Sequence, residues 1–336
     1  MPFCSPRKPN GHPRYTLEKI NPLPEFDHVR AYGLNNLGHV VGDSYTLLAA
    51  HGLGVGRAFF WVSGHPPEEL RAFGEKSSAL AINDLGDVVG WVEEAQRTGL
   101  GEDDEEHVLV PVMWVGDRQR IPQWFPLRLP SSPGDSAEVI NNRREVIGTR
   151  GAHWSVSGKT MKHRKLPLPP MPKSHRFKPT GINTDGTIVG YSYRSVQSPV
   201  SIEIEQQAWL CLRGRWKKLS PDAKTSAALG INDRKEIVGW VAPTGTAHFP
   251  MLWREAKPYP LGEQEGAAKA INAHGVIVGY TKRESRWWAS LWQDGQPILL
   301  ESRLPTGTKF PLYDAIAIND KGQILVSGAY LLTPTG

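Results

Sequence analysis

One phrase recurs seven times along the chain and constrains its fold more than any other feature. The phrase reads small-x-small-Ile-Asn-x-x-Gly-x-Val/Ile-Val-Gly. A repeat period of about 47 residues indicates an architecture in which each copy forms one structural unit. The copies are spaced by 48, 58, 42, 49, 40 and 47 residues, counted between Asn35, Asn83, Asn141, Asn183, Asn232, Asn272 and Asn319.

Each copy of the phrase predicts a β-hairpin. A short apolar strand precedes the Asn, and a second strand follows the Gly. Asn side chains hydrogen-bond the backbone of such turns, and Gly tolerates the positive φ at their end. Arg144 and Lys235 replace the Gly in the third and fifth copies, so we expect those two turns to differ. The other five copies keep it as Gly38, Gly86, Gly186, Gly275 and Gly322.

A second phrase, small-x-x-Trp-x-x-Gly, follows in most copies and predicts a third strand. Cys211 takes the Trp position in the fourth copy, and Leu332 takes it in the seventh. A short apolar strand then ends each unit. The Trp positions are Trp61, Trp114, Trp154, Trp253 and Trp292.

Four short strands in about 47 residues are the signature of a propeller blade. Gly and Pro together make up 62 of the 336 residues, which disfavours long helices. The sequence therefore predicts an all-β fold, a seven-bladed β-propeller of four-stranded antiparallel blades. We expect residues 1–13 to form a flexible tail and residues 14–336 to form one domain.

The last copy stops before its fourth strand, which predicts how the ring closes. The segment Tyr15–Ile20 resembles the fourth strands of other copies, such as Trp216–Leu219. We expect a strand within residues 14–24 to complete the C-terminal blade, residues 306–336. This arrangement removes a free sheet edge.

The repeat resembles the HAF repeat of bacterial proteins that are described as probable extracellular repeat proteins. The likeness rests on Ile-Asn-x-x-Gly-x-Val-Val-Gly followed by Ala58-Phe59-Phe60-Trp61, and it covers roughly residues 14–336. The resemblance implies a propeller-like architecture, with no agreed enzymatic activity and no catalytic residues to carry over. Members of the family commonly have export signals.

Charge, cysteines and termini narrow the classes of function. The net charge of +5 is a mild bias for this length, so nucleic acid is an unlikely partner. Cys4 and Cys211 form neither a disulfide framework nor a metal-site spacing. The N-terminus shows no apolar signal segment, which favours a cytoplasmic location, and no stretch is long enough to span a membrane. We expect a monomer with no cofactor and no metal.

Repeated residues are expected to build blades, because a group needed in every copy is most simply structural. The asparagines are interpreted as turn formers and the tryptophans as core. Function is expected on the variable loops, where the second strand passes to the third and one blade passes to the next. The acidic loop 93–108 is a candidate docking site through Glu102, Asp103, Asp104 and Glu105.

A second set of candidates combines cations with aromatic residues. It comprises Arg176 and Lys178 at the entry to the fourth copy, and Arg283, Trp287 and Trp288 in the sixth. Glu138 and Lys269 interrupt a mostly apolar series three residues before each Asn, so they are candidates for a site in the central channel.

No linear catalytic motif is present in the sequence. The favoured hypothesis is a non-catalytic propeller that presents its variable loops to a protein partner. A carbohydrate-binding propeller that uses Trp124, Trp287 or Trp288 is the alternative. A hydrolase or lyase with a carboxylate pair at the channel mouth is a weaker one.

Overall fold

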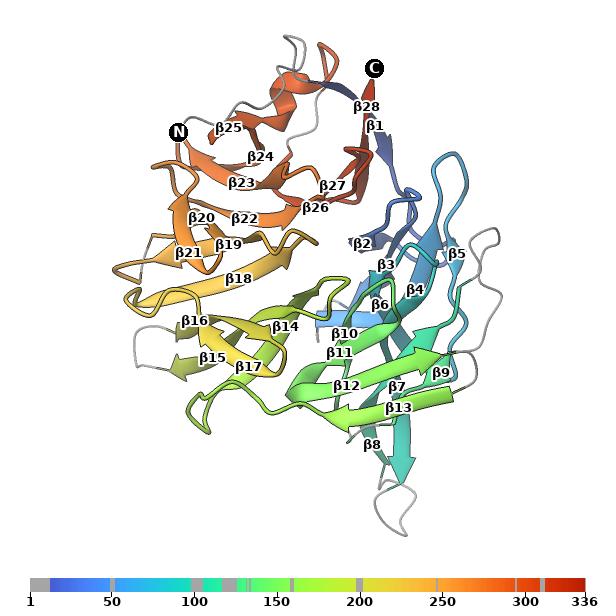
Figure 1. The fold of residues 1–336 in the computed structure, drawn as a ribbon. Helices are drawn as coiled ribbons and strands as arrows, with labels where there is room; N and C mark the ends of the chain where they lie inside the picture. The colour runs from blue at the N-terminus through green and yellow to red at the C-terminus, as the bar shows by residue number, and fades with distance from the viewer. Residues whose placement is uncertain are drawn as a thin grey trace.

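The computed structural model describes residues 13–48, 52–97, 105–116, 126–130, 132, 134–157, 160–197, 202–245, 247–293, 295–308 and 312–335. In this part of the chain, seven four-stranded antiparallel sheets surround a common centre as the blades of a propeller (Figure 1). The seven-bladed β-propeller expected from the repeat is confirmed.

The blades follow the order of the chain. Blade 1 contains β2 (His28–Leu34), β3 (Val40–Leu48), β4 (Gly52–Trp61) and β5 (Glu68–Glu69). Blade 2 contains β6 (Lys76–Ile82), β7 (Val88–Arg97), β8 (Glu105–Trp114) and β9 (Leu127–Arg128). Blade 3 contains β10 (Ala137–Ile140), β11 (Glu145–Gly148), β12 (Ala152–Ser157) and β13 (Thr160–Lys165). Blade 4 contains β14 (Arg176–Ile182), β15 (Ile188–Gln197), β16 (Ile202–Leu212) and β17 (Arg215–Lys218).

The remaining blades repeat the pattern. Blade 5 contains β18 (Thr225–Ile231), β19 (Ile237–Ala242), β20 (Phe249–Arg254) and β21 (Lys257–Pro260). Blade 6 contains β22 (Gly266–Ile271), β23 (Ile277–Arg283), β24 (Arg286–Gln293) and β25 (Gln296–Leu299). Blade 7 contains β26 (Ala315–Ile318), β27 (Ile324–Val326), β28 (Tyr330–Thr335) and β1 (Arg14–Lys19). Two short 3₁₀ turns, η1 (Thr149–Gly151) and η2 (Leu300–Arg303), lie between strands.

The N-terminal strand closes the ring. β1 pairs antiparallel with β28 over six residue pairs, from Arg14 opposite Thr335 to Lys19 opposite Tyr330. Glu18 on this strand accepts a hydrogen bond of 2.8 Å from the backbone N–H of Gly64 in blade 1. The expected closure of the last blade by an N-terminal strand is therefore confirmed, and it covers the edge that β28 would otherwise expose.

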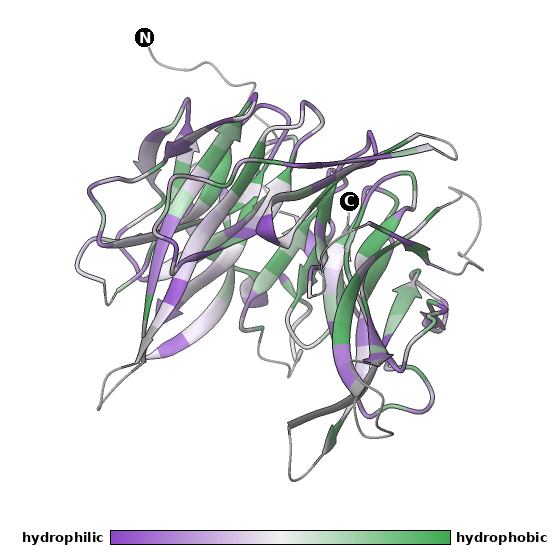
Figure 2. Cartoon of the chain, turned by 90° about the horizontal axis from the view of Figure 1, so that it is seen from below, coloured by the Kyte–Doolittle hydropathy of each residue, from purple (hydrophilic) through white to green (hydrophobic). Residues whose placement is uncertain are grey.

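The tryptophans of the third strands are core residues, as expected. Trp114, Trp154, Trp253 and Trp292 are among the largest fully buried side chains of the described residues. The indole N–H of Trp114 donates to the Arg71 oxygen at 2.8 Å, which ties blade 2 to the loop that leaves blade 1. Figure 2 shows hydrophobic residues on the strands and hydrophilic residues frequent in the turns.

Blade 4 fills its core in a different way. Cys211 pairs with Ile188 in the register that other blades give to Trp, so the sequence alignment is confirmed. Trp216 of the neighbouring strand lies opposite Cys211 and contacts Phe177 edge-on, with ring centroids 5.0 Å apart. Its indole N–H donates to the Pro167 oxygen of the preceding blade at 2.7 Å. Trp216 therefore takes over the packing and the inter-blade hydrogen bond of the missing Trp.

A β-bulge in every first strand explains the glycines of the second strands. Each bulge lies three residues before the repeated Asn, and six second strands carry Gly facing it. A Cβ atom on Gly90 would lie 1.9 Å from the Ser78 oxygen, and one on Gly279 would lie 2.0 Å from the Ala267 oxygen. Only Gly allows this approach of the two backbones.

The expectation that the third and fifth turns differ from the others is wrong. Arg144 and Lys235 adopt φ values of 59° and 61°, in the same left-handed region as the glycines of the other copies. Their backbone N–H groups donate to Asn141 and Asn232 at 3.1 and 3.0 Å, as Gly86 does to Asn83. The asparagine side chain fixes the turn strongly enough to hold a non-glycine residue in this conformation.

Candidate functional site

The two ends of the propeller differ in character. The turn end carries the seven Asn turns. The loop end is the opposite end, where second strands pass to third strands and each blade passes to the next. The sequence predicted function at the loop end, whereas a cavity of about 260 Å³ lies at the channel mouth of the turn end.

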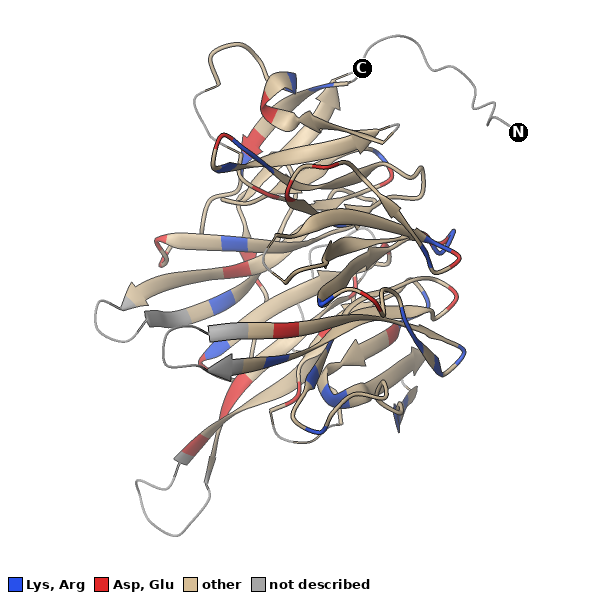
Figure 3. Ribbon diagram, turned by 90° about the vertical axis from the view of Figure 1, so that its left-hand side faces the viewer, with Lys and Arg blue, Asp and Glu red and all other residues tan. Residues whose placement is uncertain are grey.

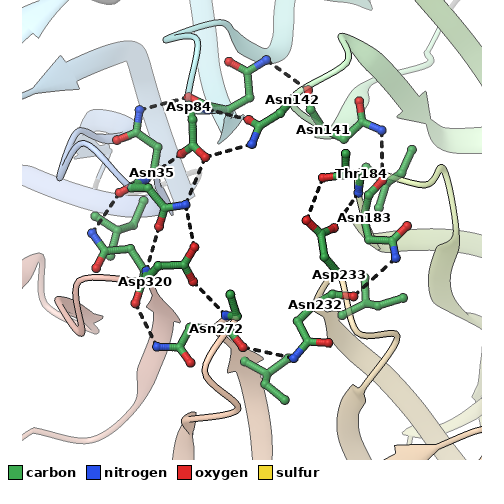
Figure 4. A pocket seen from close by; sticks show the side chains of 18 of the residues that line it. Asn35, Asp84, Asn141, Asn142, Asn183, Thr184, Asn232, Asp233, Asn272 and Asp320 are labelled. Atoms are coloured by element: carbon green, nitrogen blue, oxygen red, sulfur yellow. Dashed lines mark hydrogen bonds between the residues drawn. The ribbon is translucent and has the colours of Figure 1, made fainter.

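A closed ring of amide hydrogen bonds surrounds this mouth (Figure 4). The Nδ2 group of each repeated Asn donates to the backbone oxygen of the Asn in the next blade. The distances run from 3.0 Å for Asn35 to Asn83 up to 3.4 Å for Asn183 to Asn232. The Oδ1 atom of Asn35 also accepts the N–H groups of Leu37 and His39 within its own turn. The repeated Asn therefore forms the turn and also links neighbouring blades by a hydrogen bond.

A second polar tier is formed by the residues that follow the asparagines. Asp84 accepts from the backbone N–H of Asn36 at 2.8 Å and from the Asn142 amide at 2.9 Å. Asp320 accepts from Ala273 N–H at 2.8 Å, and Asp233 accepts from the Thr184 hydroxyl at 2.8 Å. These carboxylates also link neighbouring blades, but as acceptors, whereas the asparagine side chains are donors (Figure 4).

The floor of the mouth is apolar, and none of the described residues that line it is Lys, Arg or His. One Leu and six Ile directly precede the asparagines, and they line the cavity at Leu34, Ile82, Ile140, Ile182, Ile231, Ile271 and Ile318. The amide and carboxylate groups of the wall hydrogen-bond one another across the blades. The polar groups of the mouth therefore serve mainly to hold neighbouring blades together.

The bulged residues lie on the first strand of each blade, which is at one end of the strand order of its sheet. Glu138 and Lys269 belong to this set, but the structure does not pair them with each other. Lys178 of blade 4 lies 3.6 Å from Glu138, and Lys269 lies 3.0 Å from Asp314 of blade 7. The full set is Tyr32, Leu80, Glu138, Thr180, Leu229, Lys269 and Ile316.

Partly buried tyrosines accompany both ion pairs. Burial raises the pKa of Tyr191, and the nearby Lys178 opposes part of that shift. Burial also raises the pKa of Tyr280, with the Asp314 carboxylate adding to the shift. Both phenols therefore stay protonated at neutral pH and can donate hydrogen bonds.

Three hairpins extend past the first strands at the loop end, and we call them the arms (Figure 3). In blade 2, β6 stops opposite Glu93, while β7 and β8 continue to pair as far as Arg97 and Glu105. In blade 4, β14 stops opposite Tyr193, while β15 and β16 continue to pair. In blade 1, β3 and β4 extend past His28 in the same way.

The structure separates the candidate residues that the sequence singled out. Glu102, Asp103 and Asp104 lie outside the described residues, and Glu105 begins β8 on the arm of blade 2. Arg176 begins β14 and is exposed, on the strand that also carries Lys178. Trp124 also lies outside the described residues.

The remaining candidates lie on blade 6. Arg283 ends β23 opposite Arg286, and the Trp288 indole donates to the Arg283 oxygen at 3.3 Å. Trp287 is 42% exposed and contacts Tyr280 edge-on, with ring centroids 5.1 Å apart. These residues form one cluster, well separated in the chain from the acidic arm.

Sequence reasoning missed an ion-pair cluster on blade 1. The Arg30 guanidinium donates to both oxygens of Asp43, at 2.9 and 3.2 Å, and the Ser78 hydroxyl donates to the same carboxylate at 2.8 Å. Tyr32 donates to Asp43 at 3.3 Å. Arg30 on β2 lies opposite Asp43 on β3. A prediction of the register between these two strands could therefore have found the pair.

Neither a metal centre nor a membrane-spanning helix is found in the described ranges. No group of three or more His, Cys, Asp and Glu side chains there could hold a metal ion. No helix in the same ranges is long and apolar enough to cross a membrane.

Comparison with known proteins adds little to this geometry. A scan against protein-family models gives no match, and a search of curated proteins gives none. Among solved structures, the chain is similar to a glycosyl hydrolase from Bacteroides ovatus at 10% identity, with 74% of this chain and 80% of that chain covered. The TM-score is 0.27, so this likeness says nothing about activity.

Proposed function

We propose that the chain is a non-catalytic binding propeller that engages a protein partner through the arms at its loop end. The resemblance to the HAF repeat family, which we also propose, brings no agreed enzymatic activity and no catalytic residues to carry over, and it is compatible with this role.

The observation that carries the proposal is the exposed apolar surface of the arms. Leu47 on the arm of blade 1 is 57% exposed, and Ile204 on the arm of blade 4 is 53% exposed. Both lie on hairpins that project beyond the sheets, where no neighbouring blade covers them. Exposed apolar side chains on projecting elements with polar surroundings are typical of interaction surfaces.

The carboxylates of the loop end support a binding role over hydrolysis. Asp43 accepts hydrogen bonds from Arg30 and Ser78, while Lys178 and Lys269 lie beside Glu138 and Asp314. A glycosidase needs two carboxyl groups that face each other across a cleft. Within the described residues these three carboxylates lie in separate clusters on different blades, so they do not form such a pair.

The experiment is an affinity pull-down, read by quantitative mass spectrometry, from a lysate of cells that express the protein. The test variant carries Leu47→Ser and Ile204→Ser. The control variant carries Leu37→Ser and Leu212→Ser, which are exposed apolar residues at the turn end. A partner recovered by the wild type and the control but lost by the test variant supports the proposal. Equal recovery by all three proteins would overturn it.

A further inference from the structure

Exposed aromatic side chains gather on three consecutive blades of the loop end. Trp287 of blade 6 is 42% exposed, Tyr313 at the entry to blade 7 is 55% exposed, and Tyr32 of blade 1 is 36% exposed. Of the exposed aromatic residues in the described ranges, Tyr259 alone lies elsewhere, on the outer strand of blade 5. We call Trp287, Tyr313 and Tyr32 the aromatic arc.

Contacts connect the arc from blade 6 to blade 7. Trp287 contacts the ring of Tyr280, and the Lys269 ammonium lies 5.6 Å from the centroid of the same ring. Lys269 in turn pairs with Asp314 at 3.0 Å, and Asp314 directly follows Tyr313. Trp287 is thus connected through Tyr280 to an ion pair whose side chains are partly open to solvent, and Tyr313 is the neighbour in sequence of its carboxylate residue.

Blade 1 extends the arc with the same chemistry. Tyr32 occupies the bulge position that Lys269 occupies in blade 6 and Ile316 occupies in blade 7. A bulge turns its side chain away from the regular alternation of the strand. The Tyr32 hydroxyl donates to Asp43, which also pairs with the partly exposed Arg30 at 2.9 Å.

Three cations beside the arc pair with carboxylates, whereas Arg283 and Arg286, on the hairpin that carries Trp287, form no ion pair within the described residues. Arg30 pairs with Asp43, Lys269 with Asp314, and Lys282 with Glu265 at 3.0 Å. A phosphate or nucleic-acid site would rest mainly on cations without carboxylate partners. Matched pairs place strong donors and strong acceptors side by side, as vicinal hydroxyl groups require.

We propose that the aromatic arc binds a neutral oligosaccharide. The apolar C–H face of a pyranose ring stacks on an aromatic plane, and its hydroxyls both donate and accept hydrogen bonds. Exposed rings on three consecutive blades, accompanied by ion pairs, offer both kinds of contact. This site uses blades 6, 7 and 1 and does not use Leu47 or Ile204, so it stands independently of the proposed partner surface.

Isothermal titration with defined hexasaccharides tests the inference. The probes are neutral hexamers of glucose, xylose and mannose, together with a galacturonate hexamer of matched length. The proteins are the wild type, the separate variants Trp287→Ala, Tyr313→Ala and Tyr32→Ala, and the control Tyr259→Ala. The replaced side chains are all exposed, so thermal melting should show every variant folded.

We expect at least one neutral hexamer to bind, with each arc substitution weakening binding by up to about tenfold. Tyr259→Ala should leave the affinity unchanged. The inference is overturned if no neutral hexamer binds at about 5 mM, or if Tyr259→Ala weakens binding as much as the arc variants do. Tighter binding of the galacturonate hexamer would also overturn it, and would point to Arg283 and Arg286 instead.

Discussion

The Asn319 side chain donates a hydrogen bond of 3.0 Å to the backbone oxygen of Asn35, and this contact joins blade 7 to blade 1 across 284 residues. The same bond joins every other neighbouring pair of blades. Ring closure therefore rests on β1 at the outer edge of blade 7 and on the asparagine ring at the centre. The asparagine hydrogen bond between blades 7 and 1 is of the same type as the six bonds between blades that are consecutive in the chain.

Replacing Asn319 with Asp removes the inter-blade bond, together with the 2.8 Å bond from Nδ2 to the Gln323 side chain, and keeps the backbone contacts of the turn. The carboxylate can still accept the N–H groups of Lys321 and Gln323, which the Asn319 Oδ1 atom accepts at 3.1 and 2.9 Å. It cannot donate to Asn35. We expect Asn319→Asp to lower the free energy of unfolding by about 1–3 kcal/mol, measured by urea denaturation.

The matched control for this substitution is Asn21→Asp, an exposed position outside the ring. It should leave the free energy of unfolding nearly unchanged. Acidification should reverse part of the Asn319→Asp effect, because a protonated carboxyl group can donate again. Equal stability of the two variants at neutral pH would show that the ring bond contributes little.

Replacing Gly90 with Ala tests the bulge. The new Cβ atom would lie 1.9 Å from the Ser78 oxygen, so the two strands must move apart. We expect a loss of about 1–3 kcal/mol in the free energy of unfolding. Gly56→Ala is the control, since the nearest atom to its Cβ would be 3.7 Å away. A tolerated Gly90→Ala would contradict the account of the second-strand glycines.

Blade 4 offers a test of compensation between Cys211 and Trp216. Cys211→Trp alone should destabilise the protein by about 1–3 kcal/mol, because Trp216 already occupies the space. Adding Trp216→Pro recreates the Trp–Pro pairing of blades 5 and 6, Trp253 with Pro258 and Trp292 with Pro297. Thermal melting should show the double variant recovering most of the loss. Additive losses would mean that Trp216 does not substitute for the missing Trp.

His153 gives the stability a dependence on pH. Burial lowers its pKa below the ordinary 6.5, and the Arg164 guanidinium, which donates to Nδ1 at 2.8 Å, lowers it further. The unfolded chain therefore binds this proton more readily than the folded one does. The stabilisation is complete above about pH 6.5 and is lost as the pH falls from there through the folded pKa.

The measurement compares the free energy of unfolding at about pH 7.5 and about pH 5.5. His153→Gln should reduce the loss on acidification, because Gln does not titrate. His39 and His248, whose pKa values are also lowered by burial, should keep part of the dependence in that variant. An unchanged difference between the two pH values in His153→Gln would exclude His153 as a contributor.

The fold could be predicted from the sequence because the local pattern of each repeat is sufficient to predict its strands and its turn. The Asn and Gly positions define a turn, and the register of Cys211 and Leu332 follows once the copies are aligned. The ring of inter-blade hydrogen bonds could not be predicted in the same way. It depends on the distance between Asn35 and Asn83 in neighbouring blades, which no local pattern contains.

The candidate sites were harder to predict, because side-chain pairing between blades decides them. Glu138 and Lys269 were correctly placed on the first strands, but their partners Lys178 and Asp314 come from neighbouring blades. Tyr32 belongs to the series of residues three positions before each Asn. Its exposure to solvent depends on the packing of the neighbouring blades, which the sequence does not show. The arms form where a second strand continues for a few residues beyond the end of its first strand. The sequence does not mark where the first strand ends.

Truncating the arms tests the proposed function most directly. Residues 95–107 can be replaced by Asn-Gly, because Glu94 and Val108 face each other in register and a two-residue turn can join them. The same design applies to blade 4 between Tyr193 and Gln206, and to blade 1 between Tyr45 and Gly56. The measurement is the amount of partner recovered per mole of folded protein. Loss of recovery in the arm-truncated propeller, with the Leu37→Ser and Leu212→Ser control unaffected, is the predicted result. Full recovery without the arms would contradict the account.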